Sequence, residues 1–206
     1  MLLHPAYFAP IIQYVVQVNS ENLQFEIEDN YQKQTYRNRC YIYGANGKQL
    51  LTVPIIRNKT ETKKKSKEVK IDNNFNWQKL HIRALQTAYR SSPYFEFYED
   101  DILSVFNKKY TFLMDFNFET ISTINNCLPL ENSIYKTKEY QLSSEIINDY
   151  RYLVNAKTKK EYKFEKYTQV FDNKHGSILN LSILDLLFNE GPNALEYLAK
   201  HKNLLF

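Results

Sequence analysis

The sequence predicts one α/β domain in which a mixed sheet, with an antiparallel hairpin, is flanked by several helices. Three observations support this fold class. A strand, a turn and a helix open the chain, an Asn-Gly pair separates two β-rich segments, and several later segments have the apolar periodicity of amphipathic helices. The chain has 206 residues, enough for a full core, so we expect residues 1–206 to form a single domain.

The first residues predict a strand, a turn and a helix. Each proline restricts the residue before it to extended geometry, so His4 should close the short apolar strand at residues 2–3. Pro10, with its fixed φ, suits the first position of a helix, which leaves Tyr7 in the turn. In α/β folds ligands bind where the C-terminal end of a strand meets the N-terminus of a helix. The position of His4 therefore favours a binding site.

The next segments predict strands. In NLQFEIEDN apolar and polar residues alternate, which is typical of a strand with one buried face. Asn46 and Gly47 then lie between CYIYG and KQLLTV. A type I′ turn needs two positive φ angles, which Asn-Gly adopts at low cost, so we expect an antiparallel hairpin closed by that turn.

The segment from Arg57 to Lys70 is polar, basic and without apolar periodicity, which predicts a mobile loop. It is either a solvated loop at the sheet edge or a lid that closes on an anionic ligand. We expect the run from Lys63 to Lys67 to bury nothing.

From Phe75 onward the apolar residues recur at helical spacing and predict a helix that faces the core. The apolar stripe contains Trp77, Leu80, His81, Ala84, Leu85 and Ala88. A histidine within such a stripe is usually a buried side chain with a satisfied hydrogen bond, and the alternative is a catalytic role. Ser92, before Pro93, should end this helix and cap the next.

Weaker patterns in the rest of the chain predict a helix, a strand and a helix, at 118–126, 134–141 and 144–155 respectively. Near the C-terminus Ser182 can cap a helix, with Asp185 reaching back as in a capping box. Gly191 should end that helix, and Pro192 should open a last amphipathic helix.

The composition excludes several classes of protein. Only 4 glycines are present, and the Gly-rich phosphate loops of Rossmann and P-loop proteins are absent. Cys40 and Cys127 lack C-x-x-C spacing and the four histidines are scattered, so we expect no disulfide framework, no metal and no cofactor. The two cysteines read as ordinary buried or half-buried thiols.

The sequence also predicts a location and a class of partner. It has no secretory signal and no apolar run of about 20 residues, so we expect a cytoplasmic protein without membrane insertion. The net charge of +4 and the 17 tyrosines are compatible with nucleic-acid binding, but no motif of such modules is present. We therefore do not expect nucleic acid as the partner.

Five motifs follow one another in a recognisable order. They are HPAYF, YQKQTYRNRCYI, LTVPI, WQKLHIRALQTAY with SSPYF, and YTQVF with NLSILDLLFNEGP. Together they resemble the WbqC-like family of bacterial proteins, from His4 to about Gly191. Members of this family are associated with gene clusters for O-antigen and other surface polysaccharides. The resemblance implies work on sugar nucleotides or their carriers.

The resemblance also assigns individual positions. The family's N-terminal signature falls on His4, Pro5, Tyr7 and Phe8. Its Lys and Asn-Arg pattern falls on Lys33, Asn38 and Arg39, and its helix histidine falls on His81, which Tyr89, Pro93, Tyr94 and Phe95 follow. Relatives also carry a Ser-Gly segment before the C-terminal motif. This chain has SSEIINDYRYLVNAKTKKEY there, without glycine.

These positions suggest roles toward a sugar nucleotide. Arg39 can clamp phosphate with two hydrogen bonds, Lys33 adds a point charge, and Asn38 offers its amide to sugar or base. Stacking surfaces would come from Tyr7 and Tyr94. For general acid and base catalysis the candidates are His4 and His81, which we expect to face one pocket together with Arg39. The alternative for Arg39 is a cross-strand ion pair with Glu26 or Glu28.

Three hypotheses about function follow. The first is an enzyme that transfers a small group, of acyl or aminoacyl type, to a sugar nucleotide in surface-glycan assembly. The second is a noncatalytic module that binds a sugar nucleotide or a partner protein, which the missing Ser-Gly segment favours. The third, a nucleic-acid-binding protein, depends on the basic segment alone. The sequence leaves the donor, the acceptor and the oligomeric state open.

Overall fold

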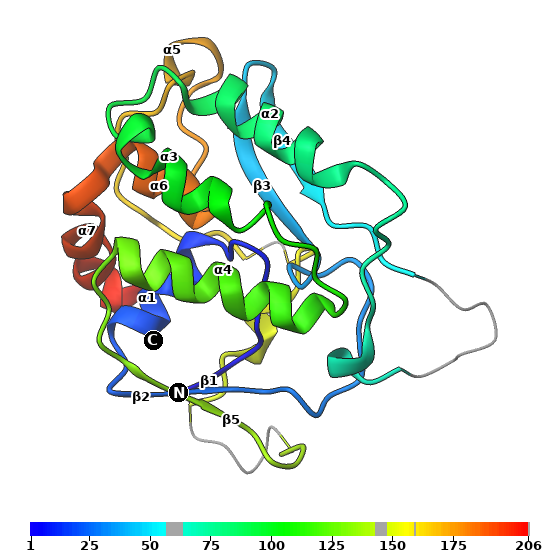
Figure 1. The fold of residues 1–206 in the computed structure, drawn as a ribbon. Coiled ribbons are helices and arrows are strands. Elements are labelled where there is room, and N and C mark those ends of the chain that lie inside the picture. The colour runs from blue at the N-terminus through cyan, green and yellow to red at the C-terminus, as the bar shows by residue number, and fades with distance from the viewer. Residues whose placement is uncertain (57–63, 143–147, 159, 206) are drawn as a thin grey trace.

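The structure is a computed structural model that describes residues 1–56, 64–142, 148–158 and 160–205 (Figure 1). It has the predicted mixed α/β architecture. The strands are β1 (Leu2–Leu3), β2 (Asn22–Phe25), β3 (Arg39–Gly44), β4 (Gly47–Thr52) and β5 (Ser133–Lys136). The α-helices are α1 (Ile11–Val18), α2 (Trp77–Tyr89), α3 (Phe95–Ser104), α4 (Leu113–Cys127), α5 (Asp172–His175), α6 (Ile183–Glu190) and α7 (Ala194–Lys200). The 3₁₀ turns are η1 (Ser66–Glu68), η3 (Arg151–Val154), η4 (Gly191–Asn193) and η5 (His201–Leu205).

The first sheet is parallel, with the strand order β1-β2-β5. On its other edge β1 is joined to a later segment, because the Leu2 N–H donates to the Asn148 carbonyl (3.0 Å) and the Tyr150 N–H donates to the Leu2 carbonyl (2.9 Å). The edge strand β1 is therefore covered on its outer side by an isolated parallel bridge between Leu2 and Asp149. The strand expected at 134–141 is shorter and ends at Lys136.

The second sheet is the antiparallel hairpin of β3 and β4. It forms where the sequence predicts it, but with a different turn. Gly44 pairs with Gly47, so Ala45 and Asn46 form the loop, and within this turn only Gly47 has a positive φ, of 92°. The prediction of a type I′ turn at Asn46 and Gly47 was wrong. The hairpin register makes Ala45 and Asn46 the loop residues, and the one left-handed φ falls on Gly47, which has no Cβ to clash there.

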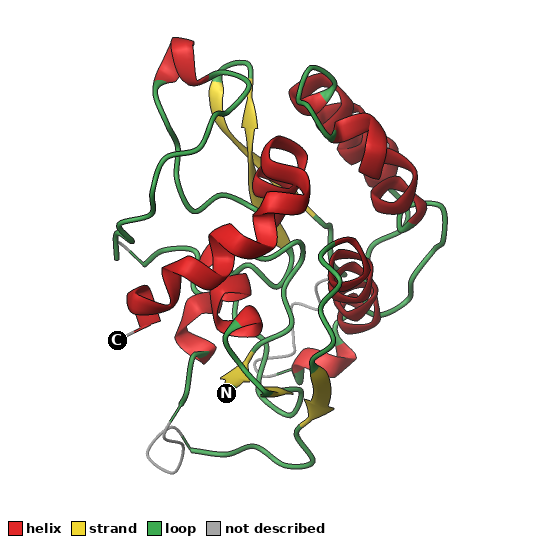
Figure 2. Cartoon of the chain, turned by 90° about the vertical axis from the view of Figure 1, so that its left-hand side faces the viewer, coloured by secondary structure: helices red, strands yellow, loops and turns green. Residues whose placement is uncertain are grey.

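The N-terminal turn and α1 form the centre of the core. Tyr7 and Phe8 are at most 1% exposed. Pro10 is not the first residue of α1, as predicted, but the extended residue directly before it, and α1 begins at Ile11. Helix α7 packs against α1, and Figure 2 shows the arrangement of helices and strands from a second side, turned by 90°. Ser182 caps α6 through its hydroxyl, which accepts from the Leu184 N–H at 3.3 Å. Gly191, with φ 52°, ends that helix.

Helix α2 forms as predicted, but its buried face is narrower. Leu80 is 63% exposed, although it belongs to the predicted stripe. At 100° per residue, Leu80 lies about 110° around the helix from the centre of the face that carries His81 and Leu85. Ser92 does not cap α3; its hydroxyl donates to the Tyr89 carbonyl at 2.7 Å and so satisfies the end of α2.

Two predictions in the second half of the chain need correction. Helix α4 begins at Leu113, five residues before the predicted start at 118. The described part of 144–155 is not an α-helix. Asn148 and Tyr150 form hydrogen bonds with Leu2, so that Asp149 makes an isolated parallel bridge to Leu2, and only the 3₁₀ turn η3 follows. Tertiary pairing with β1 therefore overrides the local helical pattern.

Candidate functional site

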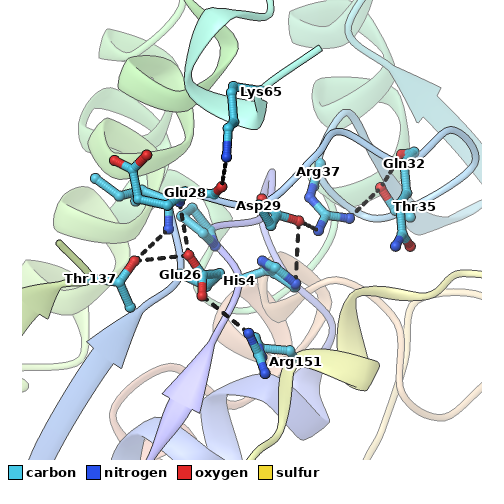
Figure 3. A network of polar contacts seen from close by, with 12 residues as sticks. His4, Glu26, Glu28, Asp29, Gln32, Thr35, Arg37, Lys65, Thr137 and Arg151 are labelled. Atoms are coloured by element: carbon cyan, nitrogen blue, oxygen red, sulfur yellow. Dashed lines mark hydrogen bonds and ion pairs between the residues drawn. The ribbon is translucent and has the colours of Figure 1, made fainter. Parts of the chain in front are cut away.

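A cavity of about 670 Å³ opens at the carboxyl ends of β1 and β2. His4 directly follows β1, as the sequence predicts, and the acidic residues after β2 form the neighbouring wall. The lining residues are mostly polar: His4, Glu28, Asp29, Asn30, Gln32, Lys65, Tyr140, Asp149, Arg151, Tyr152, Val154, Asn155 and Thr158. Figure 3 shows the charged network at its base.

His4 and Asp29 form the deepest part of this wall. The Asp29 Oδ2 atom accepts a hydrogen bond from the Arg37 guanidinium at 2.5 Å, and it lies 3.6 Å from His4 Nε2 (Figure 3). All three side chains are less than 10% exposed. Arg37 therefore fixes the carboxylate, and the carboxylate faces the imidazole.

Burial holds the pKa of His4 well below its ordinary value of 6.5. The positive charges of Arg37 and Arg151 lower this pKa further, while the backbone of Glu26 and the carboxylate of Asp149 oppose them. The imidazole is consequently neutral at physiological pH. A neutral imidazole beside a fixed carboxylate can take a proton from a ligand.

The base of the site is a second buried ion pair, between Glu26 and Arg151. Glu26 is fully buried, and its Oε2 accepts from Arg151 at 3.1 Å. Its other oxygen accepts from the Thr137 hydroxyl (2.9 Å) and the Glu28 N–H (2.8 Å). Arg151 also binds both oxygens of Asp149, at 2.8 to 3.1 Å. This pair joins β2 to η3 across the site.

The described part of the basic segment forms one wall of the cavity. Lys65 donates to the Glu28 carbonyl at 2.6 Å, and Lys67 binds the Glu28 carboxylate at 2.7 and 2.8 Å. Ser66 is buried, and its N–H donates to the Asp29 carbonyl at 2.9 Å. The prediction that this run buries nothing was wrong from Lys64 onward. Backbone hydrogen bonds with the loop after β2, at Asp29 and Asn30, hold this part of the run in place. Lys63 lies outside the described residues.

Two buried polar atoms of the cavity wall lack a hydrogen-bond partner among the described residues. They are Asp29 Oδ1 and His4 Nδ1. An unpaired polar atom in such a position costs about 1–3 kcal/mol. Both atoms are also shielded from solvent, so they belong to the buried base of the site rather than to its open surface.

His81 and Tyr7 lie together, but in the aromatic core. The Tyr7 hydroxyl is 2.8 Å from His81 Nδ1, and the ring of Trp77 packs edge-on against the imidazole. Burial lowers the pKa of His81 to about 4, and a hydrogen bond with the Thr52 backbone opposes this. His81 does not line the cavity of His4. The expected pocket shared by the two histidines is not formed.

Asn38 and Tyr94 also have structural partners. The Asn38 amide donates to the Val53 carbonyl at 3.0 Å and extends the hairpin. Tyr94 is half-buried, and its ring covers Gly191, where an added Cβ would lie only 2.5 Å from ring atoms. Neither Asn38 nor Tyr94 lines the cavity.

Arg39 and Lys33 lie outside the cavity wall. Arg39 is half-buried on β3, and its Nε is buried without a hydrogen-bond partner in the described ranges. The alternative ion pair of Arg39 is not formed, since Glu26 and Glu28 bind Arg151 and Lys67 instead. Lys33 is exposed and directly follows Gln32, a lining residue.

The sequence analysis missed most of the residues that build the site. Asp29, Arg37, Asp149 and Arg151 carry it. A signal existed for Asp29, because acidic residues directly after a strand at a predicted ligand-binding edge are candidates. No local pattern indicates Arg151, whose partner Glu26 lies 125 residues earlier.

A further buried carboxylate, that of Asp185, lies outside the cavity and joins segments of the core. It does not reach back as a capping box; its side chain accepts from Tyr89 (2.8 Å), Tyr167 (2.6 Å) and Gln169 (2.6 Å). These donors come from α2 and from the loop before α5, so Asp185 ties three segments together. The capping-box prediction was wrong because these buried donors hold its side chain.

The described residues also show whether a metal site, a disulfide or a membrane-spanning helix is formed. Within the described ranges no group of three or more potential metal ligands occurs, and Cys40 and Cys127 are free thiols, buried and half-buried respectively. None of the helices in these ranges combines the length and the apolar character needed to cross a bilayer.

Comparison with known proteins gives a family and a relative. The sequence model of the WbqC-like protein family matches residues 5–162. An uncharacterized protein of Mycobacterium tuberculosis, Rv1507c, is 25% identical over an alignment that covers 85% of this chain and 87% of that protein. No solved structure shows significant similarity to the chain.

Proposed function

The chain belongs to the WbqC-like protein family, and we propose that it transfers a small acyl or aminoacyl group to the sugar of a sugar nucleotide in surface-glycan assembly. One observation carries this proposal. His4, kept neutral by burial and by Arg37 and Arg151, lines a polar cavity beside a carboxylate that Arg37 fixes. A neutral imidazole beside a carboxylate, at the wall of a cavity, can accept a proton from a bound ligand.

The proposed reaction uses an activated acyl donor, such as a thioester. A hydroxyl or amine of the sugar attacks the carbonyl carbon of the donor, and the new bond to oxygen or nitrogen forms as the bond to the thiolate breaks. His4 takes the proton of the nucleophile and returns it to the leaving thiolate. Asp29 stabilises the imidazolium that exists between these two steps.

The walls suit a sugar. Tyr140 and Tyr152 line the cavity and offer ring faces on which a sugar ring can stack. Asn30, Gln32 and Thr158 line it as well and supply side-chain donors and acceptors for hydroxyl groups. The volume of about 670 Å³ is within the usual range for small-molecule sites. Lys33, next to Gln32, is the candidate for a phosphate contact at the rim.

The test is transfer activity of a His4→Gln variant. Wild-type protein is first screened with sugar nucleotides and labelled acyl and aminoacyl donors, and products are detected by mass spectrometry. We expect His4→Gln to lower turnover at least about 100-fold, the usual scale for a lost general base, with little change in melting temperature. His175→Gln is the matched control, because His175 is exposed and lies outside the cavity, where its ring contacts the Ala45 carbonyl and the ring of Tyr43. Equal turnover of wild type and His4→Gln would refute the role of His4.

The second candidate is a noncatalytic sugar-nucleotide-binding module. It is favoured by the missing Ser-Gly segment. Thermal-shift titration separates the two functions. Binding without catalysis is supported if a sugar nucleotide raises the melting temperature but none of the acyl or aminoacyl donors converts it to a product.

A further inference from the structure

We propose that a groove beside the cavity receives the nucleoside diphosphate part of the sugar nucleotide. This tyrosine groove is lined, among others, by Tyr36, Tyr152, Lys160 and Tyr162. The inference rests on the proposed function, because it places the nucleotide of the same ligand. Its basis is that three aromatic rings and a cation without a carboxylate partner meet directly beside the cavity.

The tyrosine groove and the cavity share a border. Tyr152, Asn155 and Thr158 line both of them. A ligand whose sugar lies in the cavity can therefore extend across this border into the groove. The enclosed volume of the groove is only about 30 Å³, so a nucleobase lies against its rings rather than inside it.

Backbone and packing contacts hold the three tyrosines in place. The Tyr36 N–H donates to the Val154 carbonyl at 2.8 Å, and Tyr152 belongs to the 3₁₀ turn η3, which ends at Val154. The ring of Tyr162 packs on the buried ring of Phe164, with 6.2 Å between the centroids. Tyr152 is 45% exposed and the other two tyrosines are half-buried. Nucleobases of every kind stack on aromatic side chains, and side chains that are already held in place lose little freedom on binding.

Lys160 supplies the charge of the tyrosine groove. Its Nζ lies 5.7 Å from the ring centroid of Tyr152 and 5.2 Å from that of Tyr162, so both rings converge on the same ammonium. No carboxylate of the described residues forms an ion pair with it. A contact between a cation and an exposed ring is weak and leaves the charge in place. The ammonium can therefore turn to a phosphate with a stronger, charge-assisted hydrogen bond, while a base takes its place on the rings.

The cavity itself has no excess of positive charge to attract a diphosphate. Its lining carries the carboxylates of Glu28, Asp29 and Asp149 against the cations of Lys65 and Arg151. The charge on the ligand thus matches the division between the two hollows. The uncharged sugar suits the balanced cavity, and the anionic nucleotide suits the basic, aromatic groove.

The first experiment compares ligands that contain different parts of a sugar nucleotide. Wild-type protein is titrated by calorimetry and by ligand-observed NMR with uridine, cytidine, thymidine, adenosine and guanosine, with their diphosphates, with hexoses and with the corresponding sugar nucleotides. We expect at least one nucleoside diphosphate to bind about tenfold more tightly than its nucleoside. Added salt should weaken the binding of that diphosphate but leave the binding of the nucleoside unchanged, because salt screens the attraction between exposed charges.

The second experiment assigns this binding to the tyrosine groove. Lys160→Gln should lower the affinity for the diphosphate about tenfold, to that of the nucleoside, and leave nucleoside binding unchanged. Tyr162→Leu should weaken the nucleoside and the diphosphate by a similar factor of about ten, because both lose the same stacking surface. Lys174→Gln is the matched control, because Lys174 is an exposed lysine of α5 that lines neither the groove nor the cavity. Lys160 is exposed as well, so Lys160→Gln should keep the fold and decides the test even if Tyr162→Leu is unstable.

The outcomes separate the two proposals. If sugar nucleotides bind no more tightly than their hexoses, the nucleotide subsite is refuted while the cavity remains a sugar site. If neither hexoses nor sugar nucleotides bind, both the subsite and the proposed function are refuted. If a nucleoside diphosphate binds Lys160→Gln as tightly as it binds wild type, the assignment to this groove is refuted.

Discussion

His4 and His81 are buried to nearly the same extent, 7% and 5% exposed, and burial lowers the pKa of both. Their neighbours differ. His4 borders a cavity and faces Asp29, in a network of ion pairs, whereas His81 is held by Tyr7 and lies among aromatic rings. Burial makes either imidazole neutral, but only the first has a carboxylate beside it and space for a ligand. The surroundings of a buried histidine, more than its burial, indicate its role.

The largest expected effect on stability concerns the charged network of His4. Arg37→Gln leaves the buried carboxylate of Asp29 without its cation, and we expect a loss of about 3–5 kcal/mol in the free energy of unfolding. Urea denaturation measures it. A double variant, Arg37→Gln with Asp29→Asn, should lose less than the sum of the single variants. A loss below about 1 kcal/mol in Arg37→Gln would show that the network is not tightly coupled.

The pH dependence of the free energy of unfolding should show the effect of burying His81 among aromatic rings. In the unfolded chain this histidine binds a proton below about 6.5, whereas in the folded protein its pKa is about 4. The stability it contributes is therefore present above pH 6.5 and is lost as the pH falls toward 4, by about 3 kcal/mol in all.

The measurement compares wild type with His81→Gln by urea denaturation at pH 7 and pH 4.5. We expect the acid-induced loss of stability to be smaller in the variant, because glutamine does not titrate. Identical losses in the two proteins would contradict the low pKa of His81. Turnover of His81→Gln at neutral pH should stay close to that of wild type, in contrast to His4→Gln.

A smaller effect is expected when one neutral hydrogen bond is removed from the aromatic cluster. Tyr7→Phe leaves His81 Nδ1 without the hydroxyl at 2.8 Å and should cost about 1–2 kcal/mol. Thermal and urea denaturation measure it. A loss as large as that of Arg37→Gln would mean that the aromatic cluster of His81 is as tightly coupled as the ion pairs around His4, which would contradict the contrast between the two histidines.

The smallest effect is expected at the basic wall. Replacing Lys63, Lys64, Lys65 and Lys67 by Ser removes the partly exposed pair of Lys67 with Glu28, and such pairs contribute at most about 1 kcal/mol. We expect a shift in melting temperature of only a few degrees. A loss of several kcal/mol would show that this segment is an integral part of the core.

The elements that depend on local chemistry could be predicted from the sequence. The prolines at positions 5 and 10 place the first strand and helix correctly, and Gly47 marks the hairpin. The failures have long-range causes. The helix expected at 144–155 gives way to pairing with Leu2, and the side chain of Asp185 turns from its own helix to Tyr89 and other donors.

The candidate site shows the same division. His4 could be placed at a strand end from the proline that follows it, and the structure confirms this position. The ion pairs of Asp29 with Arg37 and of Glu26 with Arg151 could not be predicted from the sequence, because they depend on which loops meet at the edge of the sheet. No periodicity in a single sequence encodes that meeting.

The bridge between β1 and the segment at 148–150 has a consequence for how the molecule is made. A chain growing on the ribosome can pair β1 with β2 early, but the other edge of β1 stays open until Asn148 and Tyr150 have been synthesised. Asp149 and Arg151, which complete the cavity, arrive with the same segment. The last strand contact and the binding site are thus finished in one late step, and a nascent chain that stops before residue 148 has neither.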